Sequence, residues 1–342
     1  MVFITEEMIN QLQTQLEKID EPLKKTFQNI HNGYQRETLM RFLKAREGNV
    51  SDAYKMLIDC FNWRIQNEID DILAKPIPSD MYRAIRDSQL VGMCGYSKEG
   101  LPVIALGVGL STYDKASIDY YVQSHIQMNE YRDRVILPSA TKKYGRYIGT
   151  CIKVLDMSGL KLSALNQMKL LSVISTIDDL NYPEKTETYY IVNAPYIFSA
   201  CWKVVKPLLQ ERTRKKVQVL AGSGRDDLLK IMDYESLPHF CRREGSGSSL
   251  TSRLSRHCKN GTVSNCFSLD HPFHQELYNY VKEQAALMES VAPLKTGSVH
   301  VDVPEPDPDD VIIAQTIECE LQRFGSQNEL SYALQELKIS GD

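Results

Sequence analysis

The chain has 342 residues, of which 42% are hydrophobic and 25% are charged. This composition is typical of a globular protein and argues against a fibrous or wholly disordered chain. The formal net charge of -4 argues against a dedicated nucleic-acid-binding protein, because that class is usually strongly basic. No stretch approaches the ~18 consecutive apolar residues that a membrane-spanning helix needs.

The N-terminus and the cysteines both indicate a cytoplasmic protein. Residues 1–7 (MVFITEE) lack the basic and apolar regions of a secretory signal. The eight cysteines contain no C-x-x-C pair, which favours free thiols in a reducing compartment over a disulfide framework. The His and Cys residues between positions 257 and 274 match no common zinc spacing, so we expect no bound metal. Contact with membranes is therefore expected to be peripheral.

Residues 1–78 are predicted to form a helical subdomain. Apolar side chains recur at helical spacing in residues 39–43 and again in residues 53–61. Gly48 and Asn49 separate these two helices, and the run KPIP at residues 75–78 ends the helical region.

Residues 79–244 are predicted to form an α/β domain. Short runs with β propensity occur at residues 102–106, 150–155, 188–192 and 217–221. Long helical stretches, residues 115–137 and 162–180, lie between them. Strands that alternate with helices indicate a largely parallel sheet.

Residues 245–342 are predicted to form a flexible linker and a partly helical tail. A Ser/Gly/Arg-rich stretch follows residue 245, and apolar residues share one helical face between Ile313 and Phe324. The tail is interpreted either as a surface or partly disordered segment or as a helix that binds a protein partner or another copy of the chain. The sequence leaves both interpretations open.

Residues 197–210 have too much apolar surface for an ordinary surface helix. On a helical wheel four polar residues form one narrow stripe, and apolar residues fill almost all of the rest. Pro207 interrupts a regular helix, because it lacks an N–H and clashes with the preceding turn. The stripe consists of Ser199, Lys203, Lys206 and Gln210.

Two interpretations fit this segment: a helix buried deep in the core, or an apolar lid that covers a lipid and meets the bilayer when it opens. Residues 212–216 (RTRKK) place four cations directly after it, which a deep core helix rarely has. Such a cluster suits a phosphate group or an anionic membrane surface. Nucleic acid fits less well, because no aromatic residues are interleaved with the cations.

Six motifs, in the order given below, resemble the CRAL-TRIO family. Within it the chain is most similar to the branch of yeast-type phosphatidylinositol transfer proteins, and it resembles a plant member of that branch. They are residues 39–46 (LMRFLKAR), 62–64 (NWR), 154–159 (VLDMSG), 182–184 (YPE), 190–195 (YIVNAP) and 206–209 (KPLL). The resemblance covers roughly residues 35–243. It implies a helical N-terminal subdomain on an α/β lipid-binding domain, with a mobile gate helix over an acyl pocket.

The resemblance also implies the residues that bind the lipid. The family's headgroup residues fall on Arg46, Glu184, Thr213 and Lys216. Lys and Arg suit a phosphodiester through charge-assisted bonds, and a carboxylate accepts hydrogen bonds from inositol hydroxyls. Each residue also fits a structural role, such as a surface cation, a turn residue or a strand cap. The gate and acyl-pocket residues are Ile197, Ala200, Cys201, Val204, Val205 and Leu208.

The chain departs from the family at the expected phosphatidylcholine site. Cys151 and Lys153 stand where this branch has small hydroxyl residues, while Tyr131 preserves one aromatic residue. After Arg46, where the family often has a second cation, the chain has Glu47. Phosphatidylinositol is therefore better supported as a ligand than phosphatidylcholine, and an inward-pointing Lys153 suits a more anionic ligand.

We expect a lipid carrier without cofactors that exchanges one lipid for another, such as phosphatidylinositol for phosphatidylcholine, rather than an enzyme. Burial of two tails of about 15 methylenes each stabilises the bound lipid by roughly 24 kcal/mol, at ~0.8 kcal/mol per methylene. No dinucleotide fingerprint, G-x-S-x-G elbow or phosphate loop is present. The expected partners are a phospholipid ligand and a transient membrane surface, and the protein is expected to be a monomer. The alternatives are a carrier of a tocopherol, retinoid or sterol, and a lipid-sensing adaptor that acts through its tail.

Overall fold

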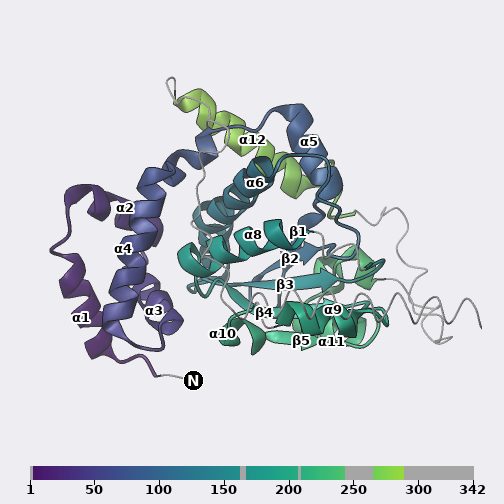
Figure 1. Ribbon diagram of the computed structural model, residues 1–342, viewed down its shortest axis with the longest axis horizontal. Helices are drawn as coiled ribbons and strands as arrows, with labels where there is room; N and C mark the ends of the chain where they lie inside the picture. Colours follow the sequence, from purple (N-terminus) through teal and green to yellow (C-terminus); the bar gives the residue numbers. More distant parts are fainter. Residues whose placement is uncertain (1–2, 162–166, 207–208, 243–264, 289–342) are drawn as a thin grey trace, which may run out of the picture.

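The computed structural model describes residues 3–161, 167–206, 209–242 and 265–288, and the following account concerns these residues (Figure 1). Within them, the side chains of Met168, Ala200, Cys201 and Val204 are not described. No helix in the described ranges is both long and apolar enough to cross a membrane.

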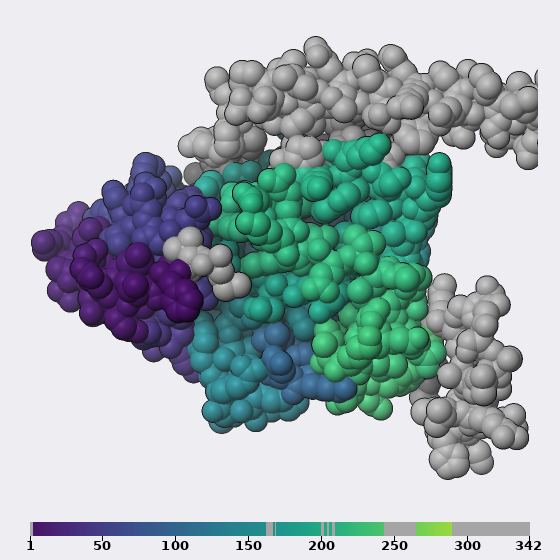
Figure 2. Space-filling view, turned by 90° about the horizontal axis from the view of Figure 1, so that it is seen from below, coloured from purple at the N-terminus to yellow at the C-terminus, as the bar shows by residue number. Residues whose placement is uncertain are grey.

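Four helices form a lobe at one end of the molecule, as predicted for the N-terminal region (Figure 2). Thr5 and Asn49 begin the first and fourth helices by accepting hydrogen bonds from backbone N–H groups in the first turn. Asn32 ends the second helix in the left-handed region, with φ of 45°. The helices are α1 (Glu6–Leu16), α2 (Glu21–His31), α3 (Gln35–Ala45) and α4 (Val50–Gln66).

The core of this lobe lies between α1, α3 and α4. Leu39, Phe42, Leu43, Leu57 and Phe61 are fully buried there, which confirms the helical periodicity read from the sequence. Burying a side chain of this size stabilises the fold by about 1.5–3 kcal/mol. A 3-10 helix (Ile69–Ala74) and α5 (Ser79–Ser88) then lead into the sheet.

The second part of the molecule is built on a five-stranded sheet in the order β1-β2-β3-β4-β5. Only β1 and β2 are antiparallel, so the predicted largely parallel sheet is confirmed. β1 was not predicted, because its two glycines and a register shift next to Gly95 hide the β pattern. The strands are β1 (Val91–Tyr96), β2 (Pro102–Leu106), β3 (Cys151–Asp156), β4 (Thr186–Val192) and β5 (Val217–Val219).

The two faces of the sheet are covered to different extents. Side chains such as Val103, Ala105 and Val154 are buried on one face, where they pack with Leu228 of α11 (Arg225–Ile231). The opposite face carries Ile104, Leu106, Lys153 and Tyr189, which are only partly buried. Figure 1 places α6 (Ile118–Tyr131) and α8 (Met168–Asn181) on that second side.

The remaining described elements are mostly short, with α12 the longest. A π-helix (Arg132–Ile136) joins α6 to α7 (Leu137–Tyr144), and α9 (Phe198–Val205) and α10 (Glu211–Arg214) lie between β4 and β5. Two 3-10 turns follow α11, and α12 comes after the undescribed residues 243–264. These last elements are Tyr234–Ser236, His239–Cys241 and α12 (Pro272–Leu287).

Helix α12 packs into the same core as α5 and α6, although the sequence analysis assigned it to a flexible linker and tail. Phe273, Leu277 and Val281 are buried in that core. His271 begins the helix by accepting a hydrogen bond from the N–H of Phe273 at 3.3 Å. The structure therefore differs from the predicted boundary at residue 245, since residues 265–288 belong to the packed domain. The predicted helix between Ile313 and Phe324 lies outside the described residues.

Candidate functional site

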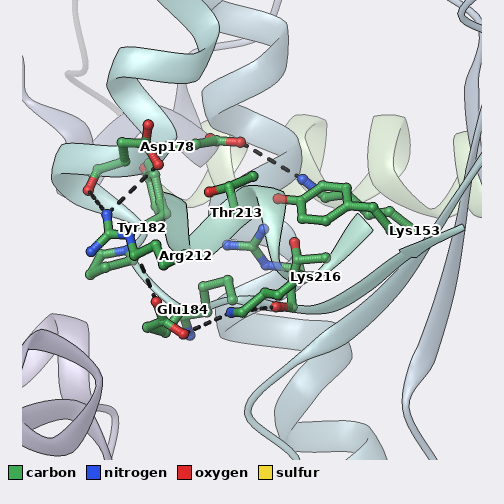
Figure 3. Close-up of a pocket in the computed structure, with 13 residues that line it drawn as sticks. Lys153, Asp178, Tyr182, Glu184, Arg212, Thr213 and Lys216 are labelled. Atoms are coloured by element: carbon green, nitrogen blue, oxygen red, sulfur yellow. Dashed lines mark hydrogen bonds and ion pairs between the residues drawn. The ribbon is translucent and has the colours of Figure 1, made fainter. Parts of the chain in front are cut away.

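A small polar cavity of about 40 Å³ lies between the end of α8, the start of β4 and α10. It is lined by Glu184, Thr213 and Lys216, three of the four residues that the resemblance assigned to the headgroup (Figure 3). Arg212 and Lys153 also line it. The structure therefore brings side chains from between residues 132 and 216 to one site.

Glu184 lies between two cations in this cavity. Its Oε2 accepts a hydrogen bond from Lys216 Nζ at 2.7 Å, and its Oε1 lies 3.8 Å from Arg212 Nε. Figure 3 shows both interactions converging on the one carboxylate. The Glu184 backbone has φ of 58°, a region that non-glycine residues seldom adopt. The preceding residue helps hold this conformation, because the Pro183 carbonyl accepts a hydrogen bond from buried Arg41 at 3.1 Å.

Arg212 connects the cavity to the N-terminal lobe. Its Nη1 donates to the Ala45 carbonyl at 2.7 Å, at the end of α3, where the helix dipole favours a cation. Arg46 Nη1 donates to the same carbonyl at 3.1 Å. Partial burial, and then repulsion from Arg212, lower the pKa of Arg46. Arg46 therefore lies beside Arg212 without lining the polar cavity. The motif comparison did not single out Arg212.

An apolar cavity of about 80 Å³ lies on the less covered face of the sheet. The strand register places Ile104, Lys153 and Tyr189 side by side in one row across this face. Lys153 and Arg132 line both this cavity and the polar one, so they stand where the two meet. The apolar wall includes Ile104, Leu106, Val108, Met128, Ile136 and Phe273.

The three residues assigned to a second headgroup site are only partly brought together. Cys151 and Lys153 line the apolar cavity, and Cys151 Sγ donates to the Lys185 carbonyl at 3.4 Å. Tyr131 does not line it. Its ring packs against Tyr280 of α12, with centroids 5.4 Å apart. The return of α12 to the core therefore gives Tyr131 a packing role that the sequence did not reveal.

The predicted gate segment contains α9, which ends at Val205, close to Pro207. Ile197 and Val205 are partly buried, while Lys203 and Lys206 of the predicted polar stripe are exposed. The rings of Phe198 and Trp202 stack with centroids 5.9 Å apart. Of the other predicted gate residues, Ala200, Cys201 and Val204 have undescribed side chains, and Leu208 lies outside the described residues.

A buried ion-pair network holds the loop that carries Glu184. Arg64 of α4 donates to both carboxylate oxygens of Glu130, at 2.8 and 2.9 Å. The Tyr182 hydroxyl donates to the same carboxylate at 2.6 Å, and Arg134 donates to it at 2.8 Å. Burial alone would raise the pKa of Glu130, but the two arginines outweigh burial and lower it to about 2. The network ties α4, α6 and the 182–184 loop together.

A wider hollow of about 880 Å³ lies at the carboxyl ends of β3 and β4. Its walls include Asp156, Asn193 and Phe240 and contain none of the predicted lipid-binding residues. The two smaller cavities form the candidate site, because there the predicted cations and an apolar wall meet. Among the described residues, no group of three or more His, Cys, Asp or Glu side chains is arranged to hold a metal ion.

Known protein families match both parts of this chain. A family model for the CRAL/TRIO domain matches residues 86–241, and one for the CRAL/TRIO N-terminal domain matches residues 8–59. Over 227 residues the chain is 28% identical to the phosphatidylinositol/phosphatidylcholine transfer protein SFH9 of Arabidopsis thaliana. This alignment covers 63% of this chain and 39% of the length of that protein. It is 29% identical over 212 residues to the SEC14 cytosolic factor of Eremothecium gossypii, covering 59% of this chain and 67% of that one.

The fold has a counterpart among solved structures. The crystal structure of Sfh5 aligns with a TM-score of 0.55 at 18% identity, covering 84% of this chain and all of that chain. At this identity the likeness shows the fold alone. The two family models together match more than half of the chain, in the order that the motifs predicted. The chain belongs to the CRAL-TRIO family.

Proposed function

We propose that the protein binds a phospholipid, most favourably phosphatidylinositol, and transfers it between membranes. The observation that carries this proposal is the meeting of a cationic cavity and an apolar cavity at Lys153 and Arg132. A phospholipid has the same two-part character, with a charged headgroup joined to apolar tails. The names of the Arabidopsis and Eremothecium relatives, a phosphatidylinositol/phosphatidylcholine transfer protein and a cytosolic factor, support it.

The polar cavity can recognise an inositol phosphodiester. Lys216 and the Thr213 hydroxyl can donate to phosphate oxygens, and Glu184 can accept from inositol hydroxyls. Lys216 is hydrogen-bonded to Glu184 and to the Thr186 carbonyl, at 2.7 and 2.9 Å. A bound phosphate therefore competes with Glu184 for Lys216. Such a rearrangement keeps the cation paired in both states, which avoids an isolated buried charge.

The lipid tails require the protein to open. Cavities that hold drug-sized ligands measure about 300–1,000 Å³, whereas the apolar cavity described above measures about 80 Å³. We propose that α9 is the element that moves, because it joins the sheet to α10 and its next residues include Pro207. Thr213 lies in α10, the next helix after α9, and Lys216 follows α10. Contact of these residues with a headgroup would then bias the position of the gate.

The same geometry disfavours the other ligand classes. A tocopherol, retinoid or sterol needs no cationic headgroup cavity, whereas Arg212 and Lys216 supply one here. We propose a carrier without catalytic activity or cofactor, acting as a monomer in the cytoplasm and meeting membranes at their surface. Recruitment of a protein partner by the C-terminal residues is the adaptor alternative. Its test is a chain that ends at residue 288, because an earlier truncation also removes the packed helix α12.

The proposal is tested by purifying the full chain from cells and identifying the lipid extracted from it by mass spectrometry. We expect phosphatidylinositol. Recovery of no phospholipid, or only of a neutral isoprenoid, would contradict the proposal.

A charge reversal then tests the headgroup residues. Thr213→Asp places an anion beside the bound phosphate and should lower phosphatidylinositol transfer between vesicles at least tenfold, since a charge-assisted bond contributes about 1.5–3 kcal/mol. Thr14→Asp, the same change at an exposed position of α1, serves as the matched control. Equal transfer by both variants would refute the assignment of Thr213.

A further inference from the structure

Arg132 has an unused donor at the boundary between the polar and apolar cavities. The residue is 5% exposed. Its Nε donates to Asp133 at 2.7 Å and its Nη1 donates to the Asn129 side-chain oxygen at 2.9 Å. Its buried Nη2 has no hydrogen-bond partner in the described part of the chain. Buried donors are nearly always paired in proteins, so this one points to a ligand.

Lys153 is a second cation at the same boundary and is only loosely paired. Its side chain is 16% exposed, and its nearest carboxylate oxygen, on Asp178, lies 3.8 Å away. The other oxygen of Asp178 already binds His125 at 2.7 Å and Asn129 at 2.8 Å. Burial lowers the pKa of Lys153, but Tyr189 and Asp178 outweigh burial and the net shift is upward. The lysine is therefore charged at neutral pH.

We propose that Arg132 and Lys153 form an inner headgroup site for an anionic phospholipid whose head ends in a phosphate monoester, as in phosphatidic acid. This inference rests on the proposed carrier function and names a second ligand class for it. The phosphate would accept from Arg132 Nη2 and Lys153 Nζ, which provide the charge-assisted donors that such a group requires. Phosphatidylinositol would use the outer residues Thr213 and Lys216, and the two lipids would compete for the same apolar space.

The inner site disfavours a choline headgroup. A quaternary ammonium is bound best over the faces of aromatic rings, away from other cations. Here Lys153 Nζ already lies 5.5 Å from the centre of the Tyr189 ring. The Tyr131 ring, which the sequence offered for this role, packs against Tyr280 and does not line the cavity. Two cations therefore stand at the inner site, where Lys153 lies over the Tyr189 ring and the Tyr131 ring does not line the cavity.

The surroundings favour a lipid over a free phosphate ion as the source of the anionic group. The cavity that contains Arg132 and Lys153 continues into a wall formed by Ile104, Leu106 and Met128. An inorganic phosphate ion has no apolar part that would use this wall. The tails of a phospholipid would gain free energy there by leaving water.

The test uses the full chain, with vesicles that contain equal mole fractions of phosphatidic acid, phosphatidylinositol and phosphatidylcholine. After incubation the protein is separated from the vesicles, and the bound lipids are quantified by mass spectrometry. Lys153→Met removes the inner charge at similar side-chain length. Lys142→Met makes the same change at an exposed position of α7. A parallel sample contains excess inorganic phosphate, and circular dichroism checks the fold of both variants.

We expect the wild type and Lys142→Met to take phosphatidic acid in preference to phosphatidylcholine, with or without inorganic phosphate. Lys153→Met should lower the ratio of bound phosphatidic acid to phosphatidylcholine at least tenfold, whereas Lys142→Met should leave this ratio within about twofold of the wild-type value. An unchanged ratio in folded Lys153→Met, or complete displacement by inorganic phosphate, would overturn the inner site. If the wild type bound phosphatidic acid but no phosphatidylinositol, the result would instead contradict the proposed function.

Discussion

Glu130 is the residue whose replacement tests the buried ion-pair network most directly. The variant Glu130→Gln keeps the shape of the side chain but removes its charge and places an amide against Arg64 or Arg134. In the wild type the carboxylate accepts four hydrogen bonds, from Arg64 twice, from Arg134 and from Tyr182. The loop that carries Glu184 starts at Tyr182, so the network also positions the candidate site.

The pKa of Glu130 sets the expected magnitude. Its pKa of about 2 lies below the ordinary value of 4.5, which corresponds to about 3 kcal/mol of stability near pH 7. Because the folded-state pKa is depressed, this contribution is present above pH 4.5 and is lost as the pH falls toward 2. It decreases to about 2 kcal/mol at pH 3.5. Removing one partner of a buried pair typically costs about 3–5 kcal/mol, which agrees.

Urea unfolding at pH 7 and at pH 3.5 measures the stability that the Glu130 charge contributes and its decrease at low pH. We expect Glu130→Gln to lower the free energy of unfolding by about 3–4 kcal/mol at pH 7, and by less at pH 3.5. Asp59→Asn, which breaks an exposed pair with Lys55, is the control and should cost less than about 1 kcal/mol. A cost below about 1 kcal/mol for Glu130→Gln, or one that does not change with pH, would refute the reasoning.

Three further variants test how the elements are held. Phe273→Ala should lower the free energy of unfolding by about 3–5 kcal/mol if α12 is part of the domain core, and a surface helix would show little change in urea unfolding. Gly92→Ala places a Cβ in a clash with the Cys266 carbonyl oxygen, so calorimetry should show a lower Tm, and an unchanged Tm would contradict the contact of β1 with this segment. Asn49→Ala removes the cap that accepts from Asp52 N and should cost about 1 kcal/mol in urea unfolding, whereas no cost would disprove the cap.

The local features of this protein were readable from its sequence. Helical periodicity in residues 39–61 and the β-rich run at residues 102–106 depend on side chains a few positions apart, and the structure confirms both. The polar stripe of the gate segment is another such feature, since Lys203 and Lys206 are exposed as the wheel predicted. The motifs that identified the family are also local features, because each is a short continuous run of residues.

The structure brings the predicted headgroup residues to one cavity where the chain itself keeps them close. Thr213 and Lys216 are three positions apart, and Glu184 lies just before the strand that pairs with the one after Lys216. Whether Arg46 lines the cavity depends on a contact between the two subdomains. In the structure, Arg212 lies between Arg46 and the cavity. No spacing within the sequence could have assigned that position.

The tertiary structure alone decided the surroundings of the site. Arg41 reaches a carbonyl 142 positions away, and Arg212 reaches one 167 positions away. The junction of the two cavities at Arg132 and Lys153, and the packing of Tyr131 under α12, also join segments that are distant in sequence. Periodicity and propensity report the local preferences of the chain. They carry no information about which buried donor will lack a partner, because that depends on how the distant elements pack.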